Sequence, residues 1–274
     1  MCELFAMSAS EATDVNHSLA LLQPRGGAVG PHADGWGVAF YEGRAARIFK
    51  EPVPAAESRC LGFITDYDFK SETVIAHIRK ANPERFGRTT ANTHPFEREW
   101  NGRSWVFAHN GKLPGLMASH GQAPRRFQPL GDTDSELAFC LMLDAIAAAG
   151  APVAGPLAAA EIIARISPLV ARLADLGEFN FFLSDGASLI VHAHTRLHQL
   201  SRACTSCIGQ LQVILLATLP LTDEPWAPLA PGSLHAFVRG HEIALQTPVF
   251  APAAPHTARP ATPAFASSTP GDRP

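Results

Sequence analysis

The chain has 274 residues, of which 46% are hydrophobic and 17% charged, as expected for a globular protein with one large domain or two small ones. Its formal net charge is −3 and it has no run of basic residues, so neither nucleic acid nor an acidic membrane is an expected partner. No apolar segment approaches the roughly 20 residues of a membrane-spanning helix, and the N-terminus lacks the pattern of a signal peptide. We therefore expect a cytoplasmic protein.

The first predicted elements are strands, rich in β-branched or aromatic residues and bounded by Gly, Pro or Asn. They span Glu3–Met7, Gly37–Tyr41, Ala46–Lys50, Thr73–Arg79 and Ser104–His109. A second set of strands is predicted later in the chain, at Asn180–Ser184, Ser188–Ala193, Gln212–Ala217, Leu234–Val238 and Glu242–Leu245.

Two helices are predicted between these sets of strands, over Thr133–Ala149 and Pro156–Leu176. The first is apolar on nearly every face and should be buried, and Thr133 and Glu136 have the spacing of a capping box. Pro168 should kink or divide the second helix. Many strands with a few helices between them predict an α+β layered domain.

The last part of the chain differs in composition from the rest. From about residue 247 it consists mainly of Pro, Ala, Ser and Thr. Such a segment buries too little apolar surface to offset the entropy of ordering it. We therefore predict a folded domain over residues 2–246 and a disordered tail over 247–274.

The cysteines are odd in number and scattered: Cys2, Cys60, Cys140, Cys204 and Cys207. Without a secretory signal they are expected to be reduced thiols rather than a disulfide framework. Cys204 and Cys207 have redox or zinc spacing, but a second pair is missing, so two incidental thiols in a loop are the better interpretation. A metal site that also used His32, His77, His94 and His109 would have no compact spacing, which argues against a metal-binding protein.

The position of Cys2 is open to two interpretations. A strand that starts here could use any small apolar residue. Alternatively, removal of Met1 would leave Cys2 with both a thiol and a free α-amino group, which would place a nucleophile and a general base on one residue.

Two strand ends carry further candidate residues. Arg79 has two interpretations. It is an ordinary solvated arginine at the end of a strand, or its planar guanidinium group binds a substrate carboxylate. Asn110 and Gly111 are a common turn pair, or an oxyanion hole in which the asparagine amide and the glycine N–H face a developing negative charge. Taken singly, each is better explained by ordinary structure.

The same applies to two loops. Asp134 lies in the first turn of a predicted helix, where an acid complements the helix dipole; facing inward, it could pair with a substrate ammonium. Thr93 and His94 lie in the polar run Asn92–Phe96, where the histidine could line a pocket.

Taken together, these residues occur in the order of a known family. The matching stretches are MCELFAMSAS, HADGWGVAFYEG, VIAHIRKAN, NTHPFERE, FAHNGKL, GDTDSE, FNFFLSDG and PLTDEPW, the last of which ends at Trp226. On these motifs the chain resembles the class II, or N-terminal nucleophile (Ntn), glutamine amidotransferases, and within them the small stand-alone members.

The resemblance implies a four-layer αββα sandwich of the Ntn-hydrolase type that recognises glutamine and uses no metal or other cofactor. It implies Cys2 as the nucleophile, its α-amine as the base, and Asn110 with Gly111 as the oxyanion hole. It further implies that Arg79 binds the α-carboxylate of glutamine and Asp134 its α-ammonium.

Thr93 and His94 would line the same pocket. In the larger synthases of the family a Trp-x-Thr-His run follows the arginine closely. Here Lys80 follows Arg79, and about a dozen residues intervene before Thr93.

The implied chemistry is consistent with reference pKa values. An α-amine titrates near 7.7–8.0 and a thiol near 8.5, so transfer of the thiol proton to the amine is nearly balanced. The thiolate of Cys2 would attack the side-chain amide, release ammonia and leave a γ-glutamyl thioester for water to hydrolyse.

The residues after about 245 leave no room for a synthase domain. We therefore expect either a separate synthase subunit that accepts the ammonia, or hydrolysis of a γ-glutamyl amide for its own sake, including one on a larger thiol-containing compound. A catalytically silent regulatory module is the remaining alternative, and the joint presence of Cys2, Arg79, Asn110 and Asp134 argues against it.

Overall fold

The computed structural model describes residues 2–81, 87–120, 125–152, 155–204 and 211–247. Its strands are β1 (Glu3–Thr13), β2 (Trp36–Glu42), β3 (Ala45–Glu51), β4 (Ser71–Ile78), β5 (Phe96–Trp100), β6 (Arg103–Lys112), β7 (Glu178–Ser184), β8 (Leu189–Ala193), β9 (His198–Cys204), β10 (Leu211–Ala217), β11 (Ala227–Pro228), β12 (Ser233–Val238) and β13 (His241–Gln246). Its α-helices are α1 (Asn16–Leu22), α2 (Arg59–Tyr67), α3 (Leu116–His120), α4 (Asp134–Ala148) and α5 (Ala159–Ala174).

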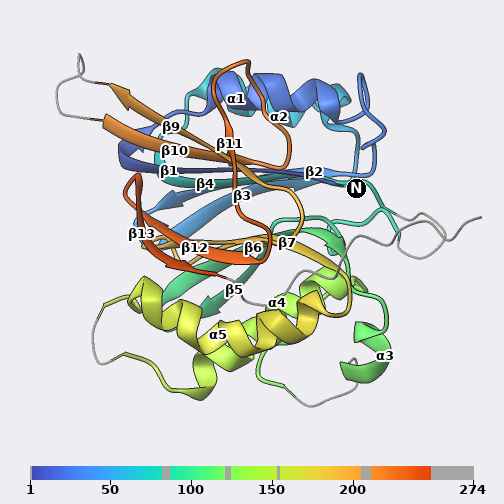
Figure 1. Cartoon of the computed structure of the whole chain (residues 1–274). Coiled ribbons are helices and arrows are strands. Elements are labelled where there is room, and N and C mark those ends of the chain that lie inside the picture. Colours follow the sequence, from blue (N-terminus) through green and yellow to red (C-terminus); the bar gives the residue numbers. More distant parts are fainter. Residues whose placement is uncertain (1, 82–86, 121–124, 153–154, 205–210, 248–274) are drawn as a thin grey trace, which may run out of the picture.

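The strands form two antiparallel sheets that lie face to face, with helices on both outer sides (Figure 1). One sheet has the strand order β11-β9-β10-β1-β4-β2-β3 and the other β13-β12-β8-β7-β6-β5. Helices α1 and α2 cover the first sheet, and α4 and α5 cover the second (Figure 1). The predicted four-layer αββα sandwich is therefore confirmed.

The layers follow from the side-chain alternation of the strands, because successive residues of a strand point to opposite faces of its sheet. On β1, Phe5 and Met7 pack in the core beneath α1 and α2. Leu4 and Ala6, which alternate with them, pack in the core between the two sheets. Strand β6 divides its side chains in the same way between the inter-sheet core and the core beneath α4 and α5. A strand whose side chains pack in two different cores must be apolar on both faces.

Each predicted strand is present, and β1 continues beyond its predicted end to Thr13. The sequence analysis missed β5, β9, β11 and the helices α1, α2 and α3. Two of the missed strands have weak apolar patterns. Strand β5 carries Glu97, Arg98 and Glu99 between its aromatic ends, and Leu200 is the only buried residue of β9.

The helix predictions are confirmed in part. Helix α4 is buried as expected, and the Thr133 hydroxyl accepts a hydrogen bond from Glu136 N–H at 3.2 Å. The second half of the capping box is wrong: the Glu136 carboxylate accepts instead from Leu130 and Gly131 N–H and pairs with Arg98 at 2.5 Å. The nearby arginine and two free N–H groups are stronger partners than one N–H.

Helix α5 runs through Pro168 as one element, so of the two predicted effects of Pro168, a kink or a division, the division is wrong. Its buried apolar face, which includes Ile162, Ile166 and Val170, packs on the six-stranded sheet and outweighs the lost backbone hydrogen bond. Within the described residues, no helix is long and apolar enough to cross a membrane. The predicted tail lies, from residue 248 onward, outside the described residues.

Candidate active site

A cavity of about 130 Å³ lies at one end of the sandwich. Its wall combines the residue before β1, the segment after β4, the end of β6 and the first turn of α4. The lining residues are Cys2, Arg79, Lys80, Ala81, His94, His109, Gly111, Lys112, Pro114, Thr133, Asp134 and Ser135. Five of the seven predicted site residues therefore meet here, and Asn110 and Thr93 are buried behind the lining.

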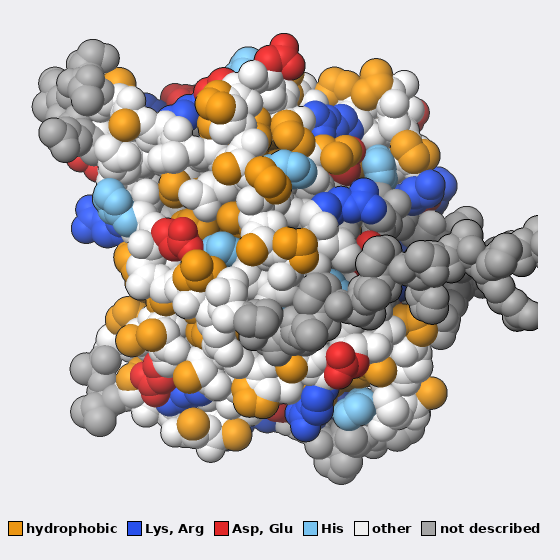
Figure 2. All heavy atoms as spheres, in the orientation of Figure 1, with side chains coloured by type: hydrophobic (Ala, Val, Ile, Leu, Met, Phe, Trp, Pro, Cys, Tyr) orange, Lys and Arg blue, Asp and Glu red, His pale blue; other side chains and the backbone are white. Residues whose placement is uncertain are grey.

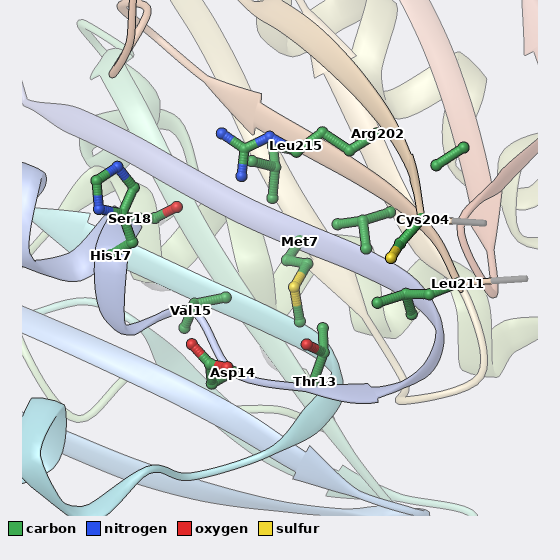
Figure 3. Close-up of a pocket in the computed structure, with 12 residues that line it drawn as sticks. Met7, Thr13, Asp14, Val15, His17, Ser18, Arg202, Cys204, Leu211 and Leu215 are labelled. Atoms are coloured by element: carbon green, nitrogen blue, oxygen red, sulfur yellow. The ribbon is translucent and has the colours of Figure 1, made fainter. Parts of the chain in front are cut away.

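A larger cavity, of about 430 Å³, lies further along β1, between β9 and the start of α1 (Figure 3). Met7 and Val15 line it, together with His17 from α1 and Arg202 from β9. None of the predicted site residues lines this cavity, so the smaller one is the candidate active site.

Cys2 immediately precedes β1. Glu3 lies opposite Ile78 in the antiparallel β1–β4 register, so Cys2 lies beside the segment that leaves β4. Its Sγ atom is 3.3 Å from the backbone nitrogen of Lys80, which donates to it, and 3.5 Å from the Lys80 carbonyl oxygen. Burial raises the pKa of the Cys2 thiol, and the Lys80 backbone hydrogen bond and the Arg79 charge act in the opposite direction. Near neutral pH the thiol therefore needs a base.

Arg79 directly follows β4 and is only 3% exposed. Its Nη1 atom donates to the Asp34 carbonyl oxygen at 3.2 Å, and its backbone N–H donates to Gly35 at 2.8 Å. The Asp34 carboxylate is itself occupied, with Ala81 N–H at 2.8 Å and Arg88 at 2.6 Å. In the described part of the chain no carboxylate forms an ion pair with Arg79, so its guanidinium faces the cavity with donors to spare.

Asn110 and Gly111 lie inside β6, paired with β7, so their interpretation as a turn is wrong. The Asn110 side-chain amide donates to the Cys2 carbonyl oxygen and links the two sheets at the site. Gly111 lines the cavity with φ at +152°, and a Cβ atom there would collide with the Glu178 carbonyl group of β7. The close approach of β7 therefore requires glycine at this position.

Asp134 is the first residue of α4 and lines the cavity. One carboxylate oxygen accepts from Leu113 N–H at 2.7 Å and the other from Ser135 N–H at 2.9 Å. These two bonds hold the carboxylate in place between the end of β6 and the start of α4. A carboxylate has about four lone-pair sites, so both oxygens can still accept from a ligand.

His94 lines the cavity, whereas Thr93 does not. The Thr93 hydroxyl donates to the Thr89 carbonyl oxygen at 2.8 Å, so it stabilises its own loop. Lys50 fixes this loop from the other side, since its Nζ donates to the Thr93 and Pro95 carbonyl oxygens at 2.9 and 3.3 Å. The two carbonyl groups flank His94, and neither nitrogen of the His94 ring has a hydrogen-bond partner among the residues that the structure describes.

Sequence reasoning missed His109 and Ser135 as parts of the lining. His109 Nδ1 is 2.8 Å from the Ser135 hydroxyl and its Nε2 is 3.0 Å from the Glu178 carbonyl oxygen. The alternation of β6 could have indicated this position, because His109 and Gly111 lie on the same face of the strand. The described residues contain no group of three or more His, Cys, Asp or Glu side chains that could hold a metal ion.

The expectation that all the cysteines are reduced is wrong for Cys204, which is disulfide-bonded. Cys204 pairs with Leu211 at the end of the antiparallel β9–β10 ladder. Cys60 and Cys140 are free, and Cys207 lies outside the described residues.

Two buried histidines, His77 and His192, predict that the folded protein is less stable in acid. Burial is the largest cause that lowers the pKa of His77 and of His192, each to about 3. In the unfolded chain a histidine titrates near 6.5, so below that pH the unfolded state binds protons that the folded state does not. The free energy of unfolding should fall by roughly 1 kcal/mol per pH unit for each of the two as the pH drops from 6 to 4. Urea denaturation across this range measures it.

His77→Phe tests the assignment, because phenylalanine has a ring of similar size and cannot bind a proton. This variant should show a shallower pH slope of the unfolding free energy, by about one proton. His241→Gln, on the exposed part of β13, is the matched control and should keep the wild-type slope. An unchanged slope in His77→Phe would contradict the prediction.

The comparison with solved structures identifies the fold. Glutamine phosphoribosylpyrophosphate amidotransferase from Bacillus subtilis superposes with a TM-score of 0.61 at 17% identity, covering 89% of this chain and 49% of that one. At this identity the likeness concerns the fold alone, and the fold is that of the Ntn hydrolases. The predicted fold class is therefore confirmed.

Sequence similarity is closer to proteins of the same size. A model of the family "Glutamine amidotransferases class-II" matches residues 1–211. YafJ of Escherichia coli, named as a candidate glutamine amidotransferase, is 38% identical over 261 residues, which cover 89% of this chain and all of YafJ. A predicted glutamine amidotransferase from Pseudomonas aeruginosa, known from a crystal structure, matches with a TM-score of 0.65 and 32% identity over 89% of this chain and all of that one. The chain belongs to the class II glutamine amidotransferases.

Proposed function

We propose that the protein hydrolyses the side-chain amide of glutamine, or of a related γ-glutamyl amide, through a thioester on Cys2. The observation that carries this proposal is the cavity in which a thiol, an arginine and a carboxylate of different strands and helices come together. An arginine and a carboxylate match the two charged ends of an α-amino acid, and the thiol matches the amide to be cleaved.

The first step is activation of the thiol. Once Met1 is removed, the backbone nitrogen of Cys2 becomes an α-amine with a reference pKa of about 7.7–8.0. This amine takes the thiol proton, and the Lys80 N–H at 3.3 Å stabilises the thiolate that forms.

The thiolate then attacks the γ-carbonyl carbon of the substrate. The side-chain amide of Asn110 has two N–H donors, of which the Cys2 carbonyl oxygen uses one. The other donor and the Gly111 N–H are the groups that we assign to the oxyanion. The C–N bond breaks, the α-ammonium returns its proton to the leaving amine, and water hydrolyses the γ-glutamyl thioester to glutamate and free Cys2.

Arg79 and Asp134 recognise the glutamyl head group in this proposal. Arg79→Ala should hydrolyse glutamine more slowly and discriminate less against 4-aminobutanamide, which is glutamine without its α-carboxylate. Loss of a charged hydrogen bond costs about 1.5–3 kcal/mol, so the preference for glutamine over the analogue should fall by roughly tenfold to a hundredfold. Ammonia release from the two compounds measures this preference.

Arg47→Ala is the control, since Arg47 lies on β3 and pairs with Glu42 at the surface. It should retain the wild-type preference. If Arg79→Ala rejects the analogue as strongly as the wild type does, Arg79 is a structural residue and the head-group assignment is wrong. A wild-type protein that hydrolyses neither glutamine nor any γ-glutamyl amide would overturn the proposed function.

A further inference from the structure

The charges that line the cavity exceed what glutamine can balance. Among the described residues, the lining contains three cations, Arg79, Lys80 and Lys112, and one anion, Asp134. The two lining histidines add no charge near neutral pH, because burial lowers the pKa of both His94 and His109. Glutamine is a zwitterion, so its carboxylate and ammonium would match Arg79 and Asp134 and leave both lysines unmatched.

Neither lysine is neutralised by a residue that the structure describes. In the part of the chain that the structure describes, no acidic side chain forms an ion pair with Lys80 or Lys112. Glu178 lies opposite Lys112 in the β6–β7 register without pairing with it, and it does not line the cavity. Two unpaired cations therefore face the same opening.

The lysines lie at the exposed end of the site. Lys80 and Lys112 are exposed, whereas Arg79 is 3% exposed. The Lys80 backbone N–H donates to the Cys2 sulfur, and Lys112 directly follows Gly111. The backbone of each lysine therefore lies next to a residue of the proposed reaction centre. In the space-filling view, Lys and Arg side chains gather near the point that Figure 1 marks as the N-terminus (Figure 2).

The cavity is large enough to enclose only one end of a γ-glutamyl substrate. About 130 Å³ is well below the 300–1,000 Å³ of pockets that enclose whole drug-sized ligands, so the interior encloses little more than a glutamyl group. Anything attached to the amide nitrogen of a longer substrate must pass the exposed mouth, where the two lysines are.

We propose that the mouth of the cavity binds a carboxylate on the leaving amine, and that the preferred substrates are γ-glutamyl amides of amino acids, such as γ-glutamyl dipeptides. The inference rests on the proposed function. The bond that breaks is the γ-amide C–N bond, the amino acid leaves with the proton returned by the Cys2 α-ammonium, and water releases glutamate from the thioester.

The test compares two ligands of equal size, γ-glutamylglycine and γ-glutamylglycinamide, which differ only in a terminal carboxylate or carboxamide. Calorimetric binding to the Cys2→Ala variant avoids hydrolysis during the measurement. The carboxylate ligand should bind about threefold to tenfold more tightly at low salt, as expected for one or two exposed charge pairs, and the difference should shrink at high salt.

Lys80→Met and Lys112→Met, each in the Cys2→Ala background, should reduce this preference, and the double variant should abolish it. Lys70→Met is the matched control, since Lys70 is an exposed lysine that precedes the far end of β4. It should leave the preference intact. Equal binding of the two ligands, or a preference that survives in the double variant, would overturn the inference.

Hydrolysis by the protein with Cys2 intact separates this inference from the proposed function. A lysine-dependent binding preference without hydrolysis of either ligand would support the charged mouth and count against the proposed function alone. Hydrolysis of both ligands with equal kcat/KM, together with equal binding, would support the proposed function and reject the charged mouth.

Discussion

Cys2→Ala should keep its fold and lose amide hydrolysis by roughly 10⁴-fold or more, as expected when the nucleophile of a covalent mechanism is removed. The side chain makes few contacts that hold the structure together, since its Sγ atom bonds only to the Lys80 backbone among the described residues. Ammonia release measures the activity, and circular dichroism with thermal melting measures the fold. Cys60→Ala, in α2 away from the cavity, is the matched control and should retain activity. Unchanged turnover in Cys2→Ala would place the nucleophile elsewhere.

The same mechanism requires that Met1 is removed. A retained methionine converts the Cys2 amine into an amide, which cannot accept the thiol proton, and burial already raises the pKa of that thiol. Protein that carries an uncleaved N-terminal tag should therefore lose activity to an extent similar to Cys2→Ala. Intact mass and N-terminal sequencing identify the first residue. Full activity of a protein that still begins with Met1 would contradict the mechanism.

Asn110→Ala should lower kcat by roughly 10²–10³-fold and change KM little, because a donor aimed at the oxyanion acts mainly in the transition state. The variant also loses the bond from the Asn110 amide to the Cys2 carbonyl oxygen, so some loss of thermal stability should accompany it. Steady-state kinetics well below the melting temperature separate the two effects. A large rise in KM at near-normal kcat would show that Asn110 binds the substrate rather than the oxyanion.

The fold could be predicted from the sequence as far as its core-forming elements. Strands such as β4 and β6 carry β-branched and aromatic residues on both faces, so their local pattern and their buried position agree. Strand β9 was not predicted because Leu200 alone is buried in it, and its remaining residues are held by backbone pairing with β10. Such pairing depends on residues distant in sequence, which local patterns do not contain.

The site was predicted as a set of residues but not as a geometry. The β1–β4 register, which brings Cys2 beside Lys80, is fixed by packing on both faces of the sheet and has no local signal. Thr93 was expected in the pocket and lies behind it, because Lys50 and Thr89 hold its loop from either side. The unpaired lysines at the mouth were not predicted, since charge balance can be judged only when the neighbours of each group are known.

The position of β1 has a consequence for the order in which the protein is made. Cys2 and β1 leave the ribosome long before β10, yet β1 is an inner strand that pairs with β4 on one side and with β10, Leu211–Ala217, on the other. Leu4 and Thr218 exchange two hydrogen bonds of 3.1 Å across a separation of 214 residues. Contacts this distant in sequence form late in folding. The thiol is therefore synthesised well before the strand that completes its surroundings, so a chain interrupted before β10 carries the proposed nucleophile without the rest of the candidate site.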